Sequence, residues 1–313
     1  MRIATISHSH VALRQQLFFQ EIAKQGHDVL MIAPGEWFDY KVRSYKQDTF
    51  ELVTCRHIGD NIYSYKLLGA KEIIESFKPD WLYVQAEPGS LTADEALDWK
   101  VDKRALFTWE NISIKGNGKL QLPRYDLVVC GNPEAESLVK PHNPHTVLML
   151  QVGVDTDHFQ ARPRVPRDVE VAYIGRPAPE KGISYLMSAW PMVKILGWKD
   201  FLELPWPYSQ IKVVVAYSQD TPEWKEQAPN YVLLEAMSTG CKGIASDTAS
   251  MVYWLKDAPG IIHVPQGKVI ELKEGIQRAL TLPNNVQEEN REYVISKFSN
   301  PVMAKKLLEV LDA

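Results

Sequence analysis

Short apolar runs alternate with segments of helical periodicity along almost the whole chain, and this pattern restricts the fold more than any other feature. RIATIS is followed by VALRQQLFFQEIAKQG and HDVLMIAP, and later KLLGAKEIIESFK precedes DWLYVQAEP. An unbroken apolar run suits a strand that is buried on both faces. Strands that alternate with helices in sequence build a parallel sheet covered by helices. The chain is therefore predicted to be an α/β protein.

A segment rich in arginine and proline separates two such alternations. QARPRVPRD, residues 160–168, carries three arginines and two prolines and has little to bury. After it come VEVAYIG, a helix expected from about residue 183 to residue 196, and then IKVVVAYS, YVLLEAMS and KGIASD. A chain of 313 residues is long enough for two domains of roughly 150 residues. We therefore predict two Rossmann-like doubly wound domains, 1–163 and 164–313, that face each other across a cleft.

Composition excludes several classes of protein. The fractions of hydrophobic residues, 45%, and of charged residues, 24%, are those of a soluble globular protein, and the net charge of -4 argues against coating nucleic acid by charge alone. Cys55, Cys130 and Cys241 lie far apart, which argues against a disulfide framework or a zinc cluster. No signal peptide or membrane span is visible in the sequence. We expect a cytoplasmic protein with at most peripheral membrane contact.

A phosphate-binding pattern opens the second alternation. In VEVAYIGRPAPEKGISYLMSAW a strand, a glycine turn and a helix follow one another, with Arg176 and Lys181 on either side of the turn. Ligands of doubly wound sheets bind beyond the carboxyl ends of the strands. Gly175 lets the backbone approach a ligand, and the helix that begins near Gly182 offers free N–H groups. The turn suits a diphosphate, although a solvated surface turn explains the same spacing taken alone.

One carboxylate, Glu235, stands inside the apolar run YVLLEAMSTG. Tyr231, Glu235 and Ser238 fall at i, i+4 and i+7 on one helical face, which a plain amphipathic helix explains. Alternatively, Glu235 lies at a ligand and accepts two hydrogen bonds from a ribose diol, as acidic residues do in other nucleotide folds. Spacing alone leaves both interpretations open.

Taken together, YIGRPAPEKGISYLMSAW and PNYVLLEAMSTGCKGIASD resemble the carboxyl-terminal domain of family 4 glycosyltransferases of the GT-B fold. YVQAEPGSL, FTWENI, VVCGNPEAESLV and QVGVDTDHF resemble the amino-terminal domain of bacterial members, so the resemblance runs from about residue 1 to the final helices. It implies a nucleotide-sugar donor held by the second domain, an acceptor held by the first, retention of anomeric configuration and no bound metal. The last helix is then free to pack back on the first domain.

The resemblance assigns roles at the donor site. Arg176 and Lys181 match the pair that neutralises the donor diphosphate, and Glu235 matches the second glutamate of the E-x7-E motif, which binds ribose. Gln227 stands where the first glutamate, which touches the donor sugar, is expected. It can hydrogen-bond a hydroxyl but carries no charge. The adjacent Glu226 takes its place only if the loop shifts register.

The sequence departs from the family pattern at three further places. SHSHVAL replaces the usual glycine pair after the first strand, so His8 and His10 are expected near the donor phosphates. Glu110 occupies the neighbourhood where relatives carry histidine or glutamine facing the reacting sugar, and it joins Arg176, Lys181 and Gln227 as a candidate catalytic residue. The segment GWKDFLELPWPYSQIKVVVAYS is short, so the second domain is expected to lack at least one strand–helix unit.

The acceptor side is predicted from aromatic and basic residues that alternate in WFDYKVRSYK. Aromatic rings stack on sugars and on bases, and together with the basic loop KGNGK this edge suits an anionic polymer such as nucleic acid. An ordinary surface loop explains the same residues. The acceptor-side candidates are Glu87, Asn111, Trp37, Tyr40, Lys41, Arg43, Lys115 and Lys119.

Possible metal motifs are better explained as structural features. Asp155 and Asp157 imitate a D-x-D metal motif, but beside the linker they suit a turn or a cap. The histidines in SHSH and in HNPH lack the carboxylate or cysteine companions of metal sites. No metal is predicted, and no cofactor other than a UDP- or GDP-linked sugar as co-substrate.

These observations favour a retaining glycosyltransferase of the hexosyltransferase type. The acceptor hydroxyl would belong to a glycan, a lipid precursor or a hydroxymethylated base in DNA, and no stable protein partner is implied. Two alternatives stay open: a nucleotide-sugar-binding protein without transfer activity, and a GT-B epimerase that acts on the nucleotide sugar itself. Donor binding without turnover would favour the first, and nucleotide release without an acceptor the second.

Overall fold

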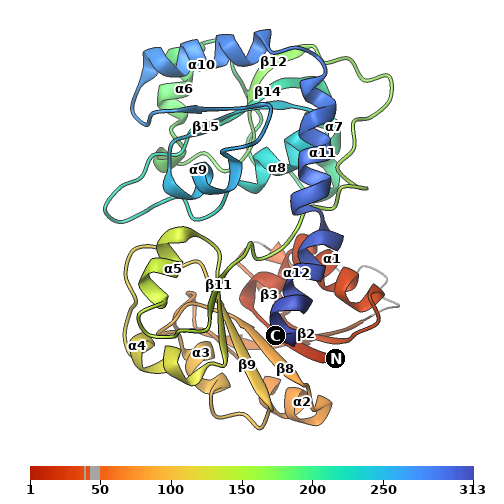
Figure 1. Ribbon diagram of the computed structural model, residues 1–313, viewed down its shortest axis with the longest axis vertical. Coiled ribbons are helices and arrows are strands. Elements are labelled where there is room, and N and C mark those ends of the chain that lie inside the picture. Colours follow the sequence, from red (N-terminus) through yellow and green to blue (C-terminus); the bar gives the residue numbers. More distant parts are fainter. Residues whose placement is uncertain (39, 43–49) are drawn as a thin grey trace. The chain divides into compact units, whose positions relative to one another are not determined.

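The computed structural model describes residues 1–38, 40–42 and 50–313. The chain forms two compact units, residues 1–153 together with 303–313, and residues 154–302. Each unit is built on one large parallel sheet (Figure 1). The predicted α/β class is therefore confirmed.

In the first unit, the described residues form a parallel sheet of seven strands in the order β11-β10-β9-β8-β1-β2-β5. The chain moves outward from β1 in both directions, so the switch of strand order lies between β1 and β8. The strands are β1 (Arg2–Ile6), β2 (Asp28–Pro34), β5 (Glu51–Cys55), β8 (Trp81–Gln85), β9 (Lys103–Thr108), β10 (Leu127–Cys130) and β11 (Thr146–Leu148).

Helices and short hairpins connect these strands. The helices are η1 (His8–Val11), α1 (Leu13–Lys24), α2 (Ala70–Phe77), α3 (Leu91–Ala96), α4 (Gly118–Gln121), η2 (Leu122–Arg124) and α5 (Pro133–Val139). Two antiparallel pairs are β3 (Glu36–Trp37) with β4 (Tyr40–Lys41) and β6 (His57–Ile58) with β7 (Lys66–Leu67). The segment KGNGK, expected to be a loop, runs into α4 at its carboxyl end.

Burial on both faces of the first sheet explains the unbroken apolar runs. Every residue of β8 is buried. On one face the strands pack against Ile74 of α2 and Val139 of α5. On the other face Phe19 of α1 lies against Tyr83 of β8, with ring centroids 6.4 Å apart. Helices on two faces are the arrangement that the alternation predicts.

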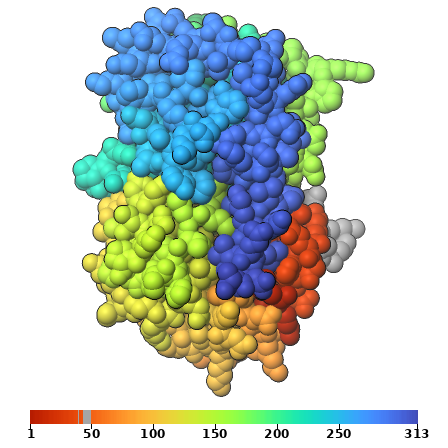
Figure 2. Space-filling view, viewed as in Figure 1, coloured from red at the N-terminus to blue at the C-terminus, as the bar shows by residue number. Residues whose placement is uncertain are grey.

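The carboxyl end of the chain belongs to the first unit. Helix α12 (Asn300–Asp312) buries Met303, Leu307 and Leu311 at i, i+4 and i+8. Figure 2 shows this blue end of the chain on the surface beside red residues from the amino terminus. The last helix thus contributes apolar side chains to the unit that contains the amino-terminal residues.

The second unit contains a parallel sheet of five strands in the order β13-β12-β14-β15-β16, counted over the described residues. The strands are β12 (Val169–Tyr173), β13 (Lys194–Ile195), β14 (Ile211–Ala216), β15 (Lys242–Ser246) and β16 (Ile261–Val264). The helices are η3 (Pro179–Lys181), α6 (Ile183–Ala189), η4 (Phe201–Glu203), α7 (Pro205–Gln210), α8 (Tyr231–Ser238), α9 (Ala249–Leu255), α10 (Val269–Thr281) and α11 (Val286–Phe298).

The helix expected over residues 183–196 is wrong in its second half. Helix α6 ends at Ala189, because the residue before a proline is disfavoured in the helical conformation and Trp190 precedes Pro191. Lys194 and Ile195 instead form β13, which pairs with the end of β12. An edge strand of two residues is too short to be recognised from periodicity.

The change of unit falls at residues 153–154, before the position of 163 expected from the arginine- and proline-rich segment. The Val154 N–H donates to the Phe298 carbonyl at 2.7 Å. The Arg291 guanidinium donates to the carbonyls of Phe159 and Thr156 at 3.0 and 3.1 Å. The chain enters the second unit at residues 154–159. These hydrogen bonds attach that segment to α11.

The three cysteines, Cys55, Cys130 and Cys241, are buried free thiols. Burial raises the pKa of the Cys241 thiol, as expected when the charged form is desolvated. In the described ranges, no helix has the length and apolar character needed to cross a membrane.

Replacing Arg291 with alanine should destabilise the second unit. The change leaves backbone carbonyls of residues 156, 159 and 238 without their charged donor. Hydrogen bonds to charged groups contribute about 1.5–3 kcal/mol. We expect a loss of that size in the free energy of unfolding, measured by urea titration. The control Arg278→Ala removes an exposed arginine of α10 and should change it by less than about 0.5 kcal/mol. Equal losses in both variants would contradict this account.

Candidate functional site

In the second unit, a glycine turn carries Arg176 and Lys181 beyond the end of β12. Gly175 has φ +142° and Gly182 has φ +65°, values that residues with side chains rarely adopt. A Cβ at Gly182 would lie 2.1 Å from the Tyr217 carbonyl oxygen, at the end of β14. The turn therefore packs directly on the neighbouring strand, and only glycine permits this contact.

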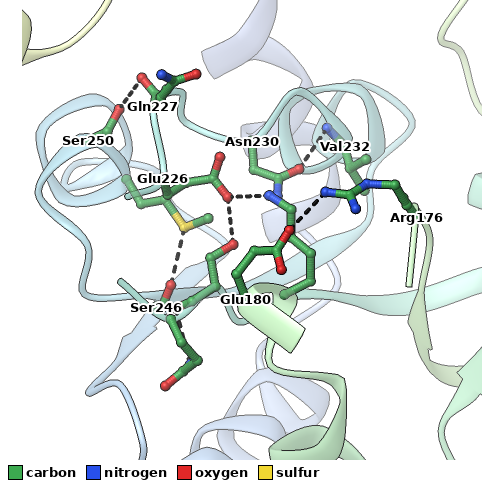
Figure 3. A network of polar contacts seen from close by, with 12 residues as sticks. Arg176, Glu180, Glu226, Gln227, Asn230, Val232, Ser246 and Ser250 are labelled. Carbon is green, nitrogen blue, oxygen red and sulfur yellow. Dashed lines mark hydrogen bonds and ion pairs between the residues drawn. The ribbon is translucent and has the colours of Figure 1, made fainter. Parts of the chain in front are cut away.

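Both cations of the turn are paired with carboxylates. The Arg176 guanidinium lies 2.8 Å from Glu180 (Figure 3), and 67% of the Arg176 side chain is exposed. The Lys181 Nζ lies 2.8 Å from Glu226, where the exposed fractions are 21% and 9%. The pKa of Glu180 is lowered, first by a backbone hydrogen bond and then by Arg176. A diphosphate at this turn would compete with these two carboxylates for the same cations.

Glu226, rather than Gln227, lies at Lys181. The Ser218 hydroxyl donates to the Glu226 carboxylate at 2.5 Å, and the Lys181 ammonium also lies 4.6 Å from the centre of the Trp224 ring. Figure 3 shows the side chains of Glu226 and Gln227 pointing in different directions. The Gln227 side chain is exposed, and its backbone carbonyl accepts from the Ser250 hydroxyl at 3.0 Å. No shift of register is needed to bring a carboxylate to the turn.

Glu235 lies on α8 but faces the interior of the unit. It is 1% exposed, and the Tyr208 hydroxyl of α7 donates to its carboxylate at 3.3 Å. On the same helical face the Ser238 hydroxyl donates to the Phe159 carbonyl at 2.7 Å. At 1% exposure, Glu235 has almost no surface open to a ribose diol in this structure.

Asn230 holds the start of α8, a role that sequence reasoning missed. Its φ of +58° lies in the left-handed region, where asparagine is better tolerated than most residues. Its side-chain oxygen accepts from the Val232 N–H at 3.2 Å. The combination of Asn before an apolar helix is a capping signal that could have identified it.

In the first unit, two glutamates follow neighbouring strands. Glu87 comes after β8 and Glu110 after β9. The Glu87 carboxylate accepts from the N–H groups of Trp109 and Glu110 at 3.2 and 2.9 Å, and from the Thr108 hydroxyl. Glu87 therefore holds the backbone that presents Glu110.

Glu110 is itself held from several sides. The Tyr63 hydroxyl donates to its carboxylate at 2.5 Å, and the N–H groups of Ile112 and Ser113 donate at 3.2 Å each. Glu110 is 6% exposed. Tyr63 was not a candidate in the sequence, because it lies far from Glu110 along the chain and in no recognisable motif.

Burial raises the pKa of Glu87 to about 7. The hydrogen bonds from Thr108 and Trp109 oppose this increase, while the nearby Glu110 carboxylate adds to it. Burial also raises the pKa of Tyr63, and Glu110 adds to that increase. Near neutral pH, Glu87 is thus partly protonated beside a second carboxylate, which is an arrangement typical of acid–base sites.

The two histidines after β1 have different environments. His10 is 0% exposed, with Nδ1 2.9 Å from the Ile32 carbonyl and Nε2 3.4 Å from the Thr5 hydroxyl. It holds the loop in the core and has no exposed surface for a phosphate. His8 is partly exposed and packs on Trp37 at 5.0 Å. Burial lowers the pKa values to about 4 for His8 and about 3 for His10, so both rings are neutral at pH 7.

The acceptor-side candidates do not form one surface. Trp37 is 6% exposed and packs against His8, His57 and Tyr65, so its ring is not available for stacking on an acceptor. Asn111 is buried as well. Tyr40, Lys41, Lys115 and Lys119 are exposed, and Arg43 lies outside the described residues.

The sheet order explains why the exposed candidates are separated. Tyr40 and Lys41 follow β2, whereas Lys115 and Lys119 follow β9, and β1 and β8 lie between these strands. Lys115 is placed by the Tyr63 ring, whose centre is 4.5 Å from its Nζ. Lys115 therefore lies near Tyr63 and Glu110 rather than near the β3–β4 hairpin.

Asp155 makes a turn, as predicted. Its carboxylate accepts from the N–H groups of Asp157 and His158 at 3.2 and 2.9 Å. Across the part of the chain that the structure describes, no three His, Cys, Asp or Glu side chains are grouped in a way that would hold a metal ion.

The chain is similar in structure to several solved glycosyltransferases. Sucrose-phosphate synthase from Thermosynechococcus elongatus matches with a TM-score of 0.78 at 16% identity, over 100% of this chain and 98% of that one. A glycosyltransferase from Rickettsia africae gives 0.74 at 17% identity, over 99% and 97%. HepE from Anabaena in complex with UDP gives 0.72 at 13% identity, over the full length of both chains.

No protein-family model matches the chain, and no curated protein matches it in sequence. At identities of this size the structural likeness establishes the fold alone. The chain has the GT-B fold of these glycosyltransferases, as predicted.

The raised pKa of Glu87 predicts a pH-dependent stability. A carboxyl group whose pKa rises from 4.5 to about 7 on folding favours the folded state at low pH and loses that contribution as pH rises through this interval. As pH rises from about 5 to about 8, wild type should therefore lose stability relative to Glu87→Gln, measured by urea titration.

A carbon-13 titration of the Glu87 carboxyl supplies the direct test. Thr108→Val removes a hydrogen bond that lowers this pKa and should raise it further. A Glu87 carboxyl that titrates near its ordinary value of 4.5 would refute the interpretation.

Proposed function

We propose that this protein is a retaining glycosyltransferase of family 4 that moves a sugar from a nucleoside diphosphate to an acceptor hydroxyl. The GT-B fold supports this proposal, as does the likeness to HepE, whose structures include complexes with UDP and with UDP-glucose. The observation that carries it is the turn after β12. This turn contains Arg176 and Lys181, and at Gly182 it packs against the Tyr217 carbonyl at the end of β14.

The task of the second unit would be to hold and neutralise the diphosphate. Arg176 and Lys181 would exchange their carboxylate partners for phosphate oxygens, which accept charge-assisted hydrogen bonds. Positioning and electrostatic stabilisation of the leaving group would then supply the catalysis. Two cations from the protein give the neutralisation that a metal ion provides in other folds, so the reaction is proposed to need no metal.

No protein nucleophile is required in this mechanism. The acceptor hydroxyl would attack the anomeric carbon on the face from which the diphosphate departs, and a diphosphate oxygen would take the hydroxyl proton. The bond to the leaving oxygen breaks and the new glycosidic bond forms on the same face of the sugar, so configuration is retained. Glu110, held by Tyr63 and by two backbone N–H groups, is proposed to accept a hydrogen bond from a sugar hydroxyl.

The acceptor is proposed to bind the first unit. Lys115 and Lys119, which are exposed and follow β9, are compatible with an anionic acceptor, whether a glycan, a lipid precursor or a hydroxymethylated base in DNA. Thr108 and Glu87 keep the Glu110 loop in one conformation. A panel of these three acceptor classes, each with a UDP- or GDP-linked sugar, would identify the substrate.

A second candidate function is donor binding without transfer. One observation favours it: Gln227 carries no charge where the family that the sequence resembles has a glutamate. Saturable donor binding with no transfer to any acceptor class would establish this alternative.

Arg176→Ala tests the donor site, because its side chain is largely exposed and its loss should leave the fold intact. We expect nucleoside diphosphates to bind about 10- to 150-fold more weakly, which corresponds to one charge-assisted hydrogen bond of about 1.5–3 kcal/mol. Binding is measured by calorimetry with UDP and GDP. The control Arg162→Ala removes an exposed arginine near the linker and should bind like wild type. Unchanged binding in Arg176→Ala would contradict the proposal.

Glu226→Gln tests whether the carboxylate competes with the donor diphosphate. The substitution keeps the shape of the side chain but removes the charge that holds Lys181. UDP or GDP should bind several-fold more tightly, because the Lys181 ammonium no longer has to leave an ion pair. Weaker binding would mean that Glu226 contacts the donor itself rather than competing with it.

A further inference from the structure

The segment that joins β13 to α7 begins in contact with the turn of the proposed donor site. At its start the Gly175 N–H donates to the Gly197 carbonyl at 3.0 Å, and the Leu196 N–H donates to the Tyr173 carbonyl at 3.0 Å. Beyond the segment, in α7, the Tyr208 hydroxyl donates to Glu235 at 3.3 Å. Residues 196 and 197 thus lie against the start of the turn that carries Arg176.

Trp198 lies in this segment, directly after the residue that contacts the glycine turn. It is 63% exposed, a large apolar surface to leave in water. Strand β13 is parallel to β12 and beside it, so Trp198 follows the carboxyl end of a strand, on the side of the sheet where ligands bind. Lys181 and Glu226 lie on the opposite side of the turn, toward β14.

The backbone around Trp198 is held in place. The Asp200 side chain accepts from the Leu202 N–H at 3.0 Å and caps η4. The Phe201 ring stacks on His158 with centroids 4.9 Å apart and an interplanar angle of 12°, and the His158 Nε2 lies 3.0 Å from the Phe201 carbonyl. Because the backbone next to Trp198 is already fixed, little backbone entropy is lost when a flat ligand binds to the ring.

A second exposed tryptophan in the same segment provides a contrast. Trp206 is 57% exposed, but it lies on α7 two residues before Tyr208, and residues at i and i+2 of a helix do not share a face. Tyr208 faces Glu235, so Trp206 faces away from it. The two tryptophans have similar exposure, but only Trp198 adjoins the donor turn.

We propose that Trp198 is the platform on which the base of the nucleoside diphosphate stacks. The proposal rests on the donor site proposed above and adds the base-binding residue to it. Arg176 and Lys181 would hold the diphosphate, and the base would lie over the Trp198 ring on the β13 side. An aromatic platform accepts any base, because every base has a π face. The hydrogen bonds that distinguish uracil from guanine must then come from other groups.

The test compares Trp198→Ala, Trp198→Phe and the control Trp206→Ala in calorimetric binding of UDP, GDP and inorganic pyrophosphate. Base–aromatic stacking predicts that Trp198→Ala weakens the binding of both nucleotides by about 5- to 150-fold. Pyrophosphate has no base, so its affinity should not change. Trp198→Phe should keep part of the nucleotide affinity, and Trp206→Ala should bind all three ligands like wild type.

Each other outcome has one meaning. If Trp198→Ala binds the nucleotides like wild type, or weakens pyrophosphate as much as UDP, Trp198 is not a base platform and the donor site stands without it. If Trp206→Ala is as weak as Trp198→Ala, the effect belongs to the segment as a whole and the proposal fails. If wild type binds none of the nucleotides, the proposed function itself is overturned.

Discussion

The close contact between Gly182 and the Tyr217 carbonyl is the constraint on which the candidate site depends. Because a side chain at residue 182 would collide with the end of β14, the turn after β12 packs directly on its neighbour. This contact brings Lys181 to the loop that follows β14, where Glu226 and Ser218 lie. Two segments that carry opposite charges are thus held together by backbone packing, before any ligand contributes.

In both units, the partly buried ionisable side chains of the candidate sites have ion-pair or hydrogen-bond partners. Lys181 has Glu226, and Glu87 is satisfied by a hydroxyl and two N–H groups at a pKa raised by burial. A charge that is removed from water without a partner is strongly destabilising. A ligand that binds the Lys181 ammonium therefore competes with the Glu226 carboxylate. Affinity at such a site is the difference in free energy between the contacts to the ligand and the protein's own contacts that the ligand replaces.

Sequence reasoning identified the elements better than the directions of side chains. The α/β alternation, the turn with Arg176 and Lys181, and the Asp155 turn were all predicted. Gln227 was placed by counting eight residues back from Glu235, yet adjacent side chains in an irregular segment point different ways, and Glu226 is the residue at Lys181 (Figure 3). Trp37 and His10 were expected at ligands but are buried, since a motif does not record which face of a loop packs inward.

The sequence alone determined the α/β alternation, the glycine turn that carries Arg176 and Lys181, and the Asp155 turn, because these depend on residues close together along the chain. Only the tertiary structure decided that Tyr63 holds Glu110, that β13 replaces half of an expected helix and that Trp198 adjoins Gly175 through Gly197. Such contacts depend on strand order and on the packing of distant segments. Periodicity carries no information about either, since it describes one element at a time.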